Sequence, residues 1–522
     1  MIRLQSYIRD AWVDGTAAGR SFVDPTTGAV LGQIDSTGVD CAGALDHARS
    51  VGRASLAALS FAARGDLIGR IADALQAERD LWLDIARKNS GNTPRDASID
   101  VDGGIGTLKY YARLAKSLGE ATTIVEAGAD KLAKADFEAR HLWTTRLGAA
   151  IHINAFNFPS WGLWEKVAVA FLAGAPVVAK PASGTAWLAE AMVRAVVEAG
   201  VLPAGSLQLV CGAAEGLLDA VGPFDSIAFT GSADTGRMIR SHPAVLAANP
   251  RVAIEADSVN LALLAPTATV SSAAFERLLE QALGAVSVKA GQLCTNIRRI
   301  LVPAALKEAF VEAFAGRIDG LVVGDPALAE VTVGPLVDER QLRAAMAGLA
   351  LLAEETRTVR GGGLPARVVG ADVASGAFLA PTLLVADTGA ELSAVHDVEV
   401  FGPVVTVIPY ADLDEAVMLA ARGEGSLAAS VYADAPSEAA DLVVRLAPVH
   451  GRVLAVDTVV GRSHTGHPIV MPQCVHGGPG RAGGGEELGG LRGIRFYMQR
   501  TAIQGSPAML EALTGGAATA AL

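Results

Sequence analysis

Cysteine is scarce in this chain, and its four copies lie far apart. Cys41, Cys211, Cys294 and Cys474 include no CxxC pair. Disulfide frameworks and cysteine zinc sites need regularly paired or closely spaced cysteines, so this spacing favours neither. A reducing cytoplasm is the compartment that this cysteine usage fits best.

Basic clusters and long apolar runs are missing as well. The 43 Lys and Arg residues stand against 55 Asp and Glu, which gives a net charge of −12. We therefore expect no nucleic-acid partner. The longest uncharged apolar run, residues 167–179, is too short to span a bilayer. The first 15 residues carry charges where a signal peptide needs an apolar core, so we expect no membrane partner either.

Several familiar catalytic motifs are absent too. The chain has no Walker-type P-loop, no HExxH, no GxSxG and no clean GxGxxG after a strand. Its nine histidines are scattered without ligand spacing, and a lone histidine is more often structural than a metal ligand. We predict no metal site.

The composition that remains, 51% hydrophobic and 19% charged, is typical of a globular protein of two or three domains. Turn signals and short apolar runs predict strands over residues 1–35. Apolar residues at three- and four-residue spacing predict helices over 39–60, 63–90 and 102–118. Residues 121–146 alternate apolar and polar side chains in part, as a hairpin arm would.

Apolar runs alternate with helical stretches from residue 147 to 257 and again from 258 to 463. This order predicts an α/β fold with two largely parallel sheets, in which ligands bind at the carboxyl ends of the strands. A glycine-dense loop at 476–490 and a strand at 494–503 are expected to close the chain.

One cysteine follows a Gly-Gln step in the stretch KAGQLCTN, residues 289–296. The preceding apolar run, 283–288, is expected to end a helix, so Cys294 should sit at a bend. A cysteine is usually a small buried hydrophobe, and only an accessible thiolate is a useful nucleophile. The residue type alone therefore favours an inert core position for Cys294. Other candidate site residues along the chain have to decide whether it is a nucleophile.

Four polar features interrupt the ends of predicted strands. Asn154 and Asn157 precede Pro159, and an amide there could bind an oxyanion or simply stabilise its own turn. Lys180 ends the strand PVVAK, with Ser183 three residues on. A lysine at that place suits a phosphate or a ribose, or else it extends over the surface.

The other two features are FTGS at 229–232 and Glu255. The amides of FTGS and the following helix N-terminus suit a phosphate, although an ordinary tight turn has the same form. Glu255 ends an apolar strand, where burial could raise the pKa of its carboxyl for general-base work; a helix or turn cap is the alternative.

Five segments, FNFP, PVVAKP, FTGS, GQLC and EVFGP, occur in an order and at separations that resemble the aldehyde dehydrogenase superfamily over nearly the whole chain. The resemblance implies that family's fold, with two parallel-sheet α/β domains and a small β oligomerisation arm. It assigns a dinucleotide-binding domain to residues 1–120 and 147–257 and a catalytic domain to 258–463. Residues 121–146 and 490–505 would form the arm of a homodimer.

Carried over residue by residue, the resemblance makes Cys294 the nucleophile that attacks an aldehyde carbonyl. Asn157 and the Cys294 N–H would hold the oxyanion. Glu255 would activate the water that hydrolyses the resulting thioester, so the product would be a free acid. The family's usual Glu-Leu-Gly-Gly is here Glu255-Ala256-Asp257-Ser258, so the loop after the base cannot rely on two glycines.

Six residues carry over to the nucleotide site. Ser183 stands where NAD-preferring relatives commonly have a glutamate, which would repel a 2′-phosphate, so we expect NADP as cofactor, with NAD as the alternative. The others are Lys180 for the adenosine ribose or its phosphate, Gly231 and Ser232 for the pyrophosphate, Glu399 for the nicotinamide ribose, and Phe401 packing nearby.

Within the family, the stretches GGIGTL, HINAFNFP, EADS and HGGPGRAGGGEELGGLRG resemble a branch that acts on CoA-linked semialdehydes. The implied substrate is 3,4-dehydroadipyl-CoA semialdehyde, formed in aerobic benzoate degradation. The alternatives are 3-oxo-5,6-dehydrosuberyl-CoA semialdehyde of phenylacetate degradation and a general aliphatic aldehyde. A catalytically silent fold kept for binding is a further alternative, which the intact Cys294, Glu255, Asn157 and Lys180 oppose.

Overall fold

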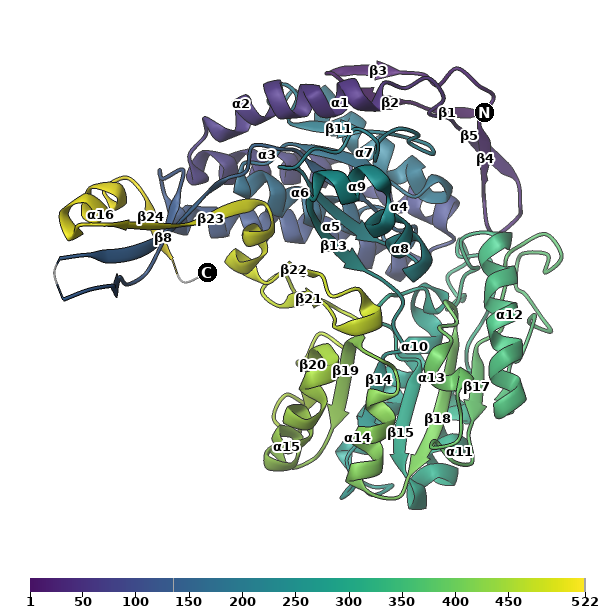
Figure 1. Cartoon of the computed structure of the whole chain (residues 1–522). Coiled ribbons are helices and arrows are strands. Elements are labelled where there is room, and N and C mark those ends of the chain that lie inside the picture. The colour runs from purple at the N-terminus through teal and green to yellow at the C-terminus, as the bar shows by residue number, and fades with distance from the viewer. Residues whose placement is uncertain (135, 521–522) are drawn as a thin grey trace.

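The computed structural model describes residues 1–134 and 136–520, which form two lobes and a projecting arm (Figure 1). Each lobe is built on one seven-stranded sheet, most of whose strands are parallel. The α/β fold class predicted from the sequence, two parallel-sheet units with a small β arm, is confirmed. No helix among the described residues combines the length and the apolar character that a membrane crossing requires.

The first sheet begins with five parallel strands and ends with an antiparallel hairpin. Apolar residues fill both faces, as a covered parallel sheet requires: Ala150 packs on one side and Ile151 on the other. In spatial order the strands are β13 (Arg251–Glu255), β12 (Ser226–Thr230), β9 (Ala150–Ile153), β10 (Val177–Lys180), β11 (Leu207–Leu209), β2 (Ser6–Ile8) and β3 (Ala11–Val13).

Helices cover both faces of this sheet. One face packs against α3 (Phe61–Ala77), α4 (Arg79–Ser90), α5 (Pro94–Ala115), α6 (Trp161–Ala173) and α7 (Ala186–Glu198). The other packs against α1 (Cys41–His47), α8 (Ala233–Ser241) and α9 (Pro243–Ala248). Beside this lobe lies a three-stranded sheet of β1 (Ile2–Leu4), β5 (Val30–Ile34) and β4 (Arg20–Val23).

The second sheet has six parallel strands and one antiparallel edge strand, β16. Its order is β16 (Arg357–Arg360), β17 (Thr382–Val385), β18 (Val404–Tyr410), β15 (Arg299–Pro303), β14 (Leu261–Leu264), β19 (Ser426–Tyr432) and β20 (His450–Val456). Helices α10 (Ala273–Ser287) and α11 (Lys307–Ile318) cover one face. The other is covered by α12 (Glu339–Glu355), α13 (Ala394–Asp397), α14 (Leu413–Ala421) and α15 (Pro436–Leu446).

The arm is a ribbon in which β8 (Glu138–Thr145) pairs antiparallel with β23 (Met498–Gly505). It is completed by β6 (Ile124–Glu126), β7 (Asp130–Lys131), β24 (Ala518–Ala520) and α16 (Pro507–Thr514). Between the lobes lies a hairpin of β21 (Val475–Gly477) and β22 (Glu486–Leu488) (Figure 1). The prediction of a strand at 494–503 was wrong about where the strand starts. Gly490–Phe496 forms a 3₁₀ segment, and strand pairing begins at Met498.

Helix boundaries differ from the prediction where caps and breaks decide them. The helix predicted over 63–90 is two helices that divide at Glu78, whose φ/ψ of −113° and 26° is not helical. The helix expected at 102 begins earlier, at Pro94, because Thr93 and Asp96 form a reciprocal capping box. The stretch 39–60 is broken by a π turn, Ala48–Gly52, between α1 and α2 (Arg53–Ala57).

Strand register in the first sheet brings the four predicted polar features to one edge. Lys180 lies beside Ile153, the residue before Asn154, and Thr230 lies beside Glu255. All four strands are parallel, so their carboxyl ends open in the same direction. The candidate site is built on this edge.

Candidate active site

Cys294 lies at the end of a loop with unusual backbone geometry. Lys289, Ala290 and Gly291 have φ values of 50°, 49° and 72°, three left-handed residues in a row. Left-handed backbone is disfavoured for residues other than glycine, so surrounding contacts have to impose it on Lys289 and Ala290. Gly291 is required for space as well, since a Cβ there would lie 2.1 Å from the Gly402 carbonyl oxygen.

Side chains from both lobes hold this loop. Lys289 Nζ donates to Asn92 Oδ1 at 3.2 Å. Burial raises the pKa of the Asp100 carboxyl on α5, and the charge of the Lys289 ammonium partly offsets this rise. Asn260 Nδ2 donates to the Cys294 carbonyl oxygen at 2.8 Å. The Cys294 N–H has no acceptor among the described residues, so it is available to a bound carbonyl oxygen.

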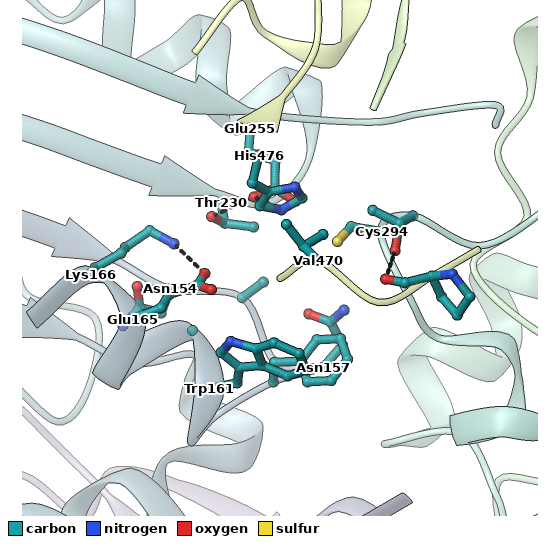
Figure 2. A pocket seen from close by; sticks show the side chains of 15 residues that line it. Asn154, Asn157, Trp161, Glu165, Lys166, Thr230, Glu255, Cys294, Val470 and His476 are labelled. Atoms are coloured by element: carbon teal, nitrogen blue, oxygen red, sulfur yellow. Dashed lines mark hydrogen bonds and ion pairs between the residues drawn. The ribbon is translucent and has the colours of Figure 1, made fainter. Parts of the chain in front are cut away.

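Glu255 ends β13 and points into the same space (Figure 2). Its Oε2 lies 3.0 Å from His476 Nε2 and accepts a 3.4 Å hydrogen bond from Thr230 Oγ1. Burial acts to raise the pKa of the Glu255 carboxyl, but His476 and then Lys166 outweigh it and hold that pKa below its ordinary value. Glu255 is therefore a carboxylate at neutral pH.

The Cys294 thiol lies beside this carboxylate. Sulfur, carboxylate oxygen and imidazole nitrogen of Cys294, Glu255 and His476 all lie within 4.8 Å of one another. Burial, and after it the charge of Glu255, raise the pKa of the Cys294 thiol well above its usual value. The resting residue is thus a thiol. The sequence predicts a nucleophilic thiol and a water-activating carboxylate side by side, which explains the cluster, and we assign no metal to it.

Two amides from the loop after β9 line the same chamber as the thiol. Asn157 is buried, and its Nδ2 donates to the Gln292 carbonyl oxygen at 3.1 Å. One of its two N–H groups stays free for a ligand. Asn154 is 5% exposed, and neither atom of its amide has a partner among the described residues. The structure thus brings Asn157, Glu255 and Cys294 together, as expected from the sequence.

A large cavity of about 1030 Å³ opens above the carboxyl edge of the first sheet. All six residues assigned to the nucleotide line it: Lys180, Ser183, Gly231, Ser232, Glu399 and Phe401. Its size suits a dinucleotide. Ser232 is the N-cap of α8 and accepts from the Thr235 N–H at 3.4 Å, so the helix N-terminus opens into the cavity, where it suits phosphate.

Glu399 and Phe401 line the cavity from the second lobe. Burial raises the pKa of Glu399 to about 7, against the opposing charge of Arg298, whose Nη2 lies 3.4 Å from its carboxylate. Phe401 packs edge-to-face on Phe156 at 5.5 Å between ring centroids. Lys180, at the end of β10, is half-buried, and burial lowers the pKa of its ammonium. Both lobes thus contribute polar groups that fit a nucleotide.

A second, narrower chamber of about 50 Å³ reaches the thiol from the other side (Figure 2). Phe158, Trp161 and Val470 give it apolar walls, and Asn154 and His476 also line it. Chamber and cavity share the residues at their junction, namely Asn154, Ala155, Asn157, Thr230, Glu255 and Cys294. A ligand in each would therefore meet at Cys294.

The loop after the base is held by polar bonds in place of glycines. Asp257 Oδ1 accepts from the Ala233 N–H at 3.0 Å, at the start of α8. The Ser258 N–H donates to Glu399 at 3.1 Å, and Ser258 Oγ donates to Asn260 Oδ1 at 2.6 Å. The Ala-Asp-Ser sequence thereby ties Glu255 to residues of the cofactor cavity.

His476 is the site residue that the sequence analysis missed. It belongs to the glycine-dense stretch that we expected to be only a loop, and a lone histidine carried no signal of its own. Glu165, Lys166 and Glu487 form a second missed group beside it, in which Lys166 Nζ lies 3.0 Å from Glu487 and 3.6 Å from Glu165. Adjacent opposite charges in the apolar helix α6 were the available signal.

Comparisons with known proteins show which family the chain belongs to. The profile of the aldehyde dehydrogenase family matches residues 12–503. A curated relative, 3,4-dehydroadipyl-CoA semialdehyde dehydrogenase from Aromatoleum evansii, is 49% identical over 92% of this chain and 93% of its own.

Solved structures show the same fold at lower identity. One is a betaine aldehyde dehydrogenase double mutant from Staphylococcus aureus in complex with NAD⁺, with 24% identity, 96% coverage of both chains and a TM-score of 0.84. Another is 3,6-anhydro-L-galactose dehydrogenase in complex with NADP, with 22% identity, coverage of 96% of this chain and all of that one, and a TM-score of 0.83. Because the family profile matches the chain almost from end to end, the chain belongs to the aldehyde dehydrogenase family.

Proposed function

We propose that this chain oxidises 3,4-dehydroadipyl-CoA semialdehyde to the carboxylic acid, with NADP as cofactor, in aerobic benzoate degradation. The 49% identity to an enzyme of that name over nearly the full length of both chains carries the proposal. The narrow chamber supports it, because an unbranched aliphatic chain is the shape that fits along its apolar walls of Phe158, Trp161 and Val470 to reach the thiol.

The chemistry divides into two halves at Cys294. The sulfur bonds to the aldehyde carbonyl carbon, and the thiol proton passes to solvent water. Asn157 Nδ2 and the Cys294 N–H hold the oxygen that becomes negative. The residues that line the cavity would hold a nicotinamide nucleotide, which would supply the hydride acceptor for this adduct. Glu255 then takes a proton from water as the water oxygen bonds to the thioester carbon, and the carbon–sulfur bond breaks to release the acid.

NADP is proposed over NAD because no carboxylate stands at Ser183. Two arginines, Arg20 of β4 and Arg340 of α12, line the same cavity. Asp338, also in the lining, caps α12 by accepting from the Gln341 N–H at 2.7 Å. A serine hydroxyl can donate to a 2′-phosphate, and the two arginines add positive charge to the lining of the cavity.

We further propose a division of labour among the parts of the chain. Residues 1–120 and 147–257 bind the nucleotide, 258–463 carry the nucleophile, and 121–146 with 490–505 join two copies into a homodimer. One edge of β23 has no pairing strand among the described residues, so it offers a surface for a second copy. All four cysteines are free, which supports a reducing cytoplasm.

The test is NADP reduction at 340 nm with matched aldehydes. We expect 3,4-dehydroadipyl-CoA semialdehyde to exceed free hexanal in kcat/KM by at least about tenfold. The phenylacetate-pathway CoA semialdehyde serves as the competitor in the same panel. Equal turnover of free and CoA-linked aldehydes would make the chain a general aliphatic aldehyde dehydrogenase. Light scattering tests the dimer, which a monomer would contradict.

A further inference from the structure

His476 has no part in the assignments above, yet it lies against the base (Figure 2). It sits in β21, opposite Glu487 of β22. Its side chain is 7% exposed, and that of Glu255 is 5% exposed. The next residue, Gly477, has a φ of 141°, and a Cβ there would lie 1.9 Å from the Gly485 carbonyl oxygen. Glycine is thus needed for the hairpin to bring the imidazole this close.

His476 decides where the Glu255 carboxylate points. The contact from Thr230 to the same oxygen is longer, 3.4 Å against 3.0 Å. Glu255 Oε1 has no partner among the described residues. His476 is the dominant restraint, because its contact is the shorter one and its ring can carry the charge opposite to that of the carboxylate. It fixes Oε2 and leaves Oε1 as the free acceptor at the junction of cavity and chamber.

The charges around the imidazole favour its cationic form. Glu255 faces it from β13, Glu165 and Lys166 from α6, and Glu487 from β22, while Cys294 adds a neutral thiol. Burial acts to lower the pKa of His476, but Glu255, and after it Glu165 and Glu487, raise that pKa above its ordinary value. An imidazolium and a carboxylate then form the pair.

We propose that His476 is a positioning residue that acts through Glu255 in thioester hydrolysis. The inference rests on the proposed function, because it concerns the second half of that reaction. Glu255 Oε1 takes one proton from water, the hydroxyl oxygen bonds to the thioester carbon, and the carbon–sulfur bond breaks. The thiolate of Cys294 then recovers the proton from Glu255. His476 holds Oε2 throughout.

An activated ester isolates this half of the reaction, since it needs neither aldehyde nor nucleotide. With 4-nitrophenyl acetate, the initial burst of nitrophenolate measures acylation of Cys294, and the steady state measures hydrolysis of the acyl-enzyme. We expect His476→Leu to keep the burst rate within about twofold. Its steady-state rate should fall about tenfold, the factor that one hydrogen bond to a charged group supplies. His476→Gln, which keeps a donor, should recover most of the loss.

The double variant separates a positioning role from a structural one. Combined with Glu255→Gln, His476→Leu should cause no further loss in the steady state, because its effect passes through the carboxylate. The matched control is His467→Gln. His467 is buried, its Nδ1 lies 2.7 Å from Ser430 Oγ, and it has no hydrogen bond to Glu255 among the described residues. The His467→Gln variant should therefore keep the ratio of burst rate to steady-state rate.

Equal slowing of burst and steady state by His476→Leu would overturn the proposal. So would a His476→Leu effect of the same size with and without Glu255. Failure of the proposed substrate would appear in the aldehyde panel and leave the ester kinetics unchanged, so the two results are distinguishable.

Discussion

The two cavities that meet at Cys294 are built in different ways. The floor of the cofactor cavity, about 1030 Å³, lies on strand ends of the first sheet and the loops after them, while α12, Glu399 and Phe401 line it from the second lobe. The chamber, about 50 Å³, takes its walls from α6, from the residue after Cys294 and from the segment between Pro468 and His476. The floor of the cavity follows from sheet topology, whereas all the walls of the chamber depend on packing between distant segments. Cofactor binding and aldehyde selection should therefore respond to different substitutions.

The largest effect should come from the junction itself. Cys294→Ala removes the nucleophile and should lower NADP reduction by at least about 10³-fold. Neither cavity loses a wall, so the dissociation constant for NADP, measured by calorimetric titration, should change less than about twofold. Retention of a tenth of wild-type turnover would contradict the role of Cys294.

The cofactor cavity should be sensitive to charge at one position. Ser183→Glu sets a carboxylate against the 2′-phosphate and should weaken NADP binding about 10- to 100-fold. Binding of NAD and the KM for the aldehyde should stay within about threefold. Ser183→Ala is the matched control and should have a smaller effect. Comparable catalytic efficiency with NAD and NADP in the wild type would refute the cofactor preference.

The chamber should be sensitive to aromatic volume. Trp161 packs at 5.7 Å from Phe158 and over Gly103, where a Cβ would lie 2.1 Å from the indole. Trp161→Ala should shift the ratio of kcat/KM between branched and linear aldehydes about tenfold towards the branched ones. NADP binding should not change. Phe137→Ala, on the exposed arm, is the control. An unaltered ratio would exclude Trp161 from substrate selection.

The smallest effect is a shift in the pH dependence of thiol alkylation. The Glu255 charge raises the pKa of the Cys294 thiol, second only to burial. Glu255→Gln removes this charge, so the thiolate should form at lower pH. Iodoacetamide inactivation, followed from pH 6 to 10, should rise earlier in the variant than in the wild type. A shift towards higher pH would show that Glu255 assists ionisation of the thiol.

The same contrast explains what the sequence could and could not predict. Lys180, Thr230 and Glu255 each end an apolar run, and parallel strands bring such ends together, so the cofactor edge follows from local pattern and topology. The start of α5 was missed because the capping box at Thr93 decides it. His476 was missed because it matters only through Glu255, which lies far from it along the chain and beside it in the fold. The roles of individual residues came from family resemblance.

The most direct measurement is the stoichiometry of NADPH formation in the first turnover. On rapid mixing of Glu255→Gln with NADP and the aldehyde, we predict one equivalent of NADPH per active site at nearly the wild-type rate. A steady state at least about 100-fold slower should follow, because hydrolysis alone needs the carboxylate. Cys294→Ala should give no burst. Loss of the burst in Glu255→Gln would contradict the division of labour, since it would place the carboxylate in the thiol's half of the reaction.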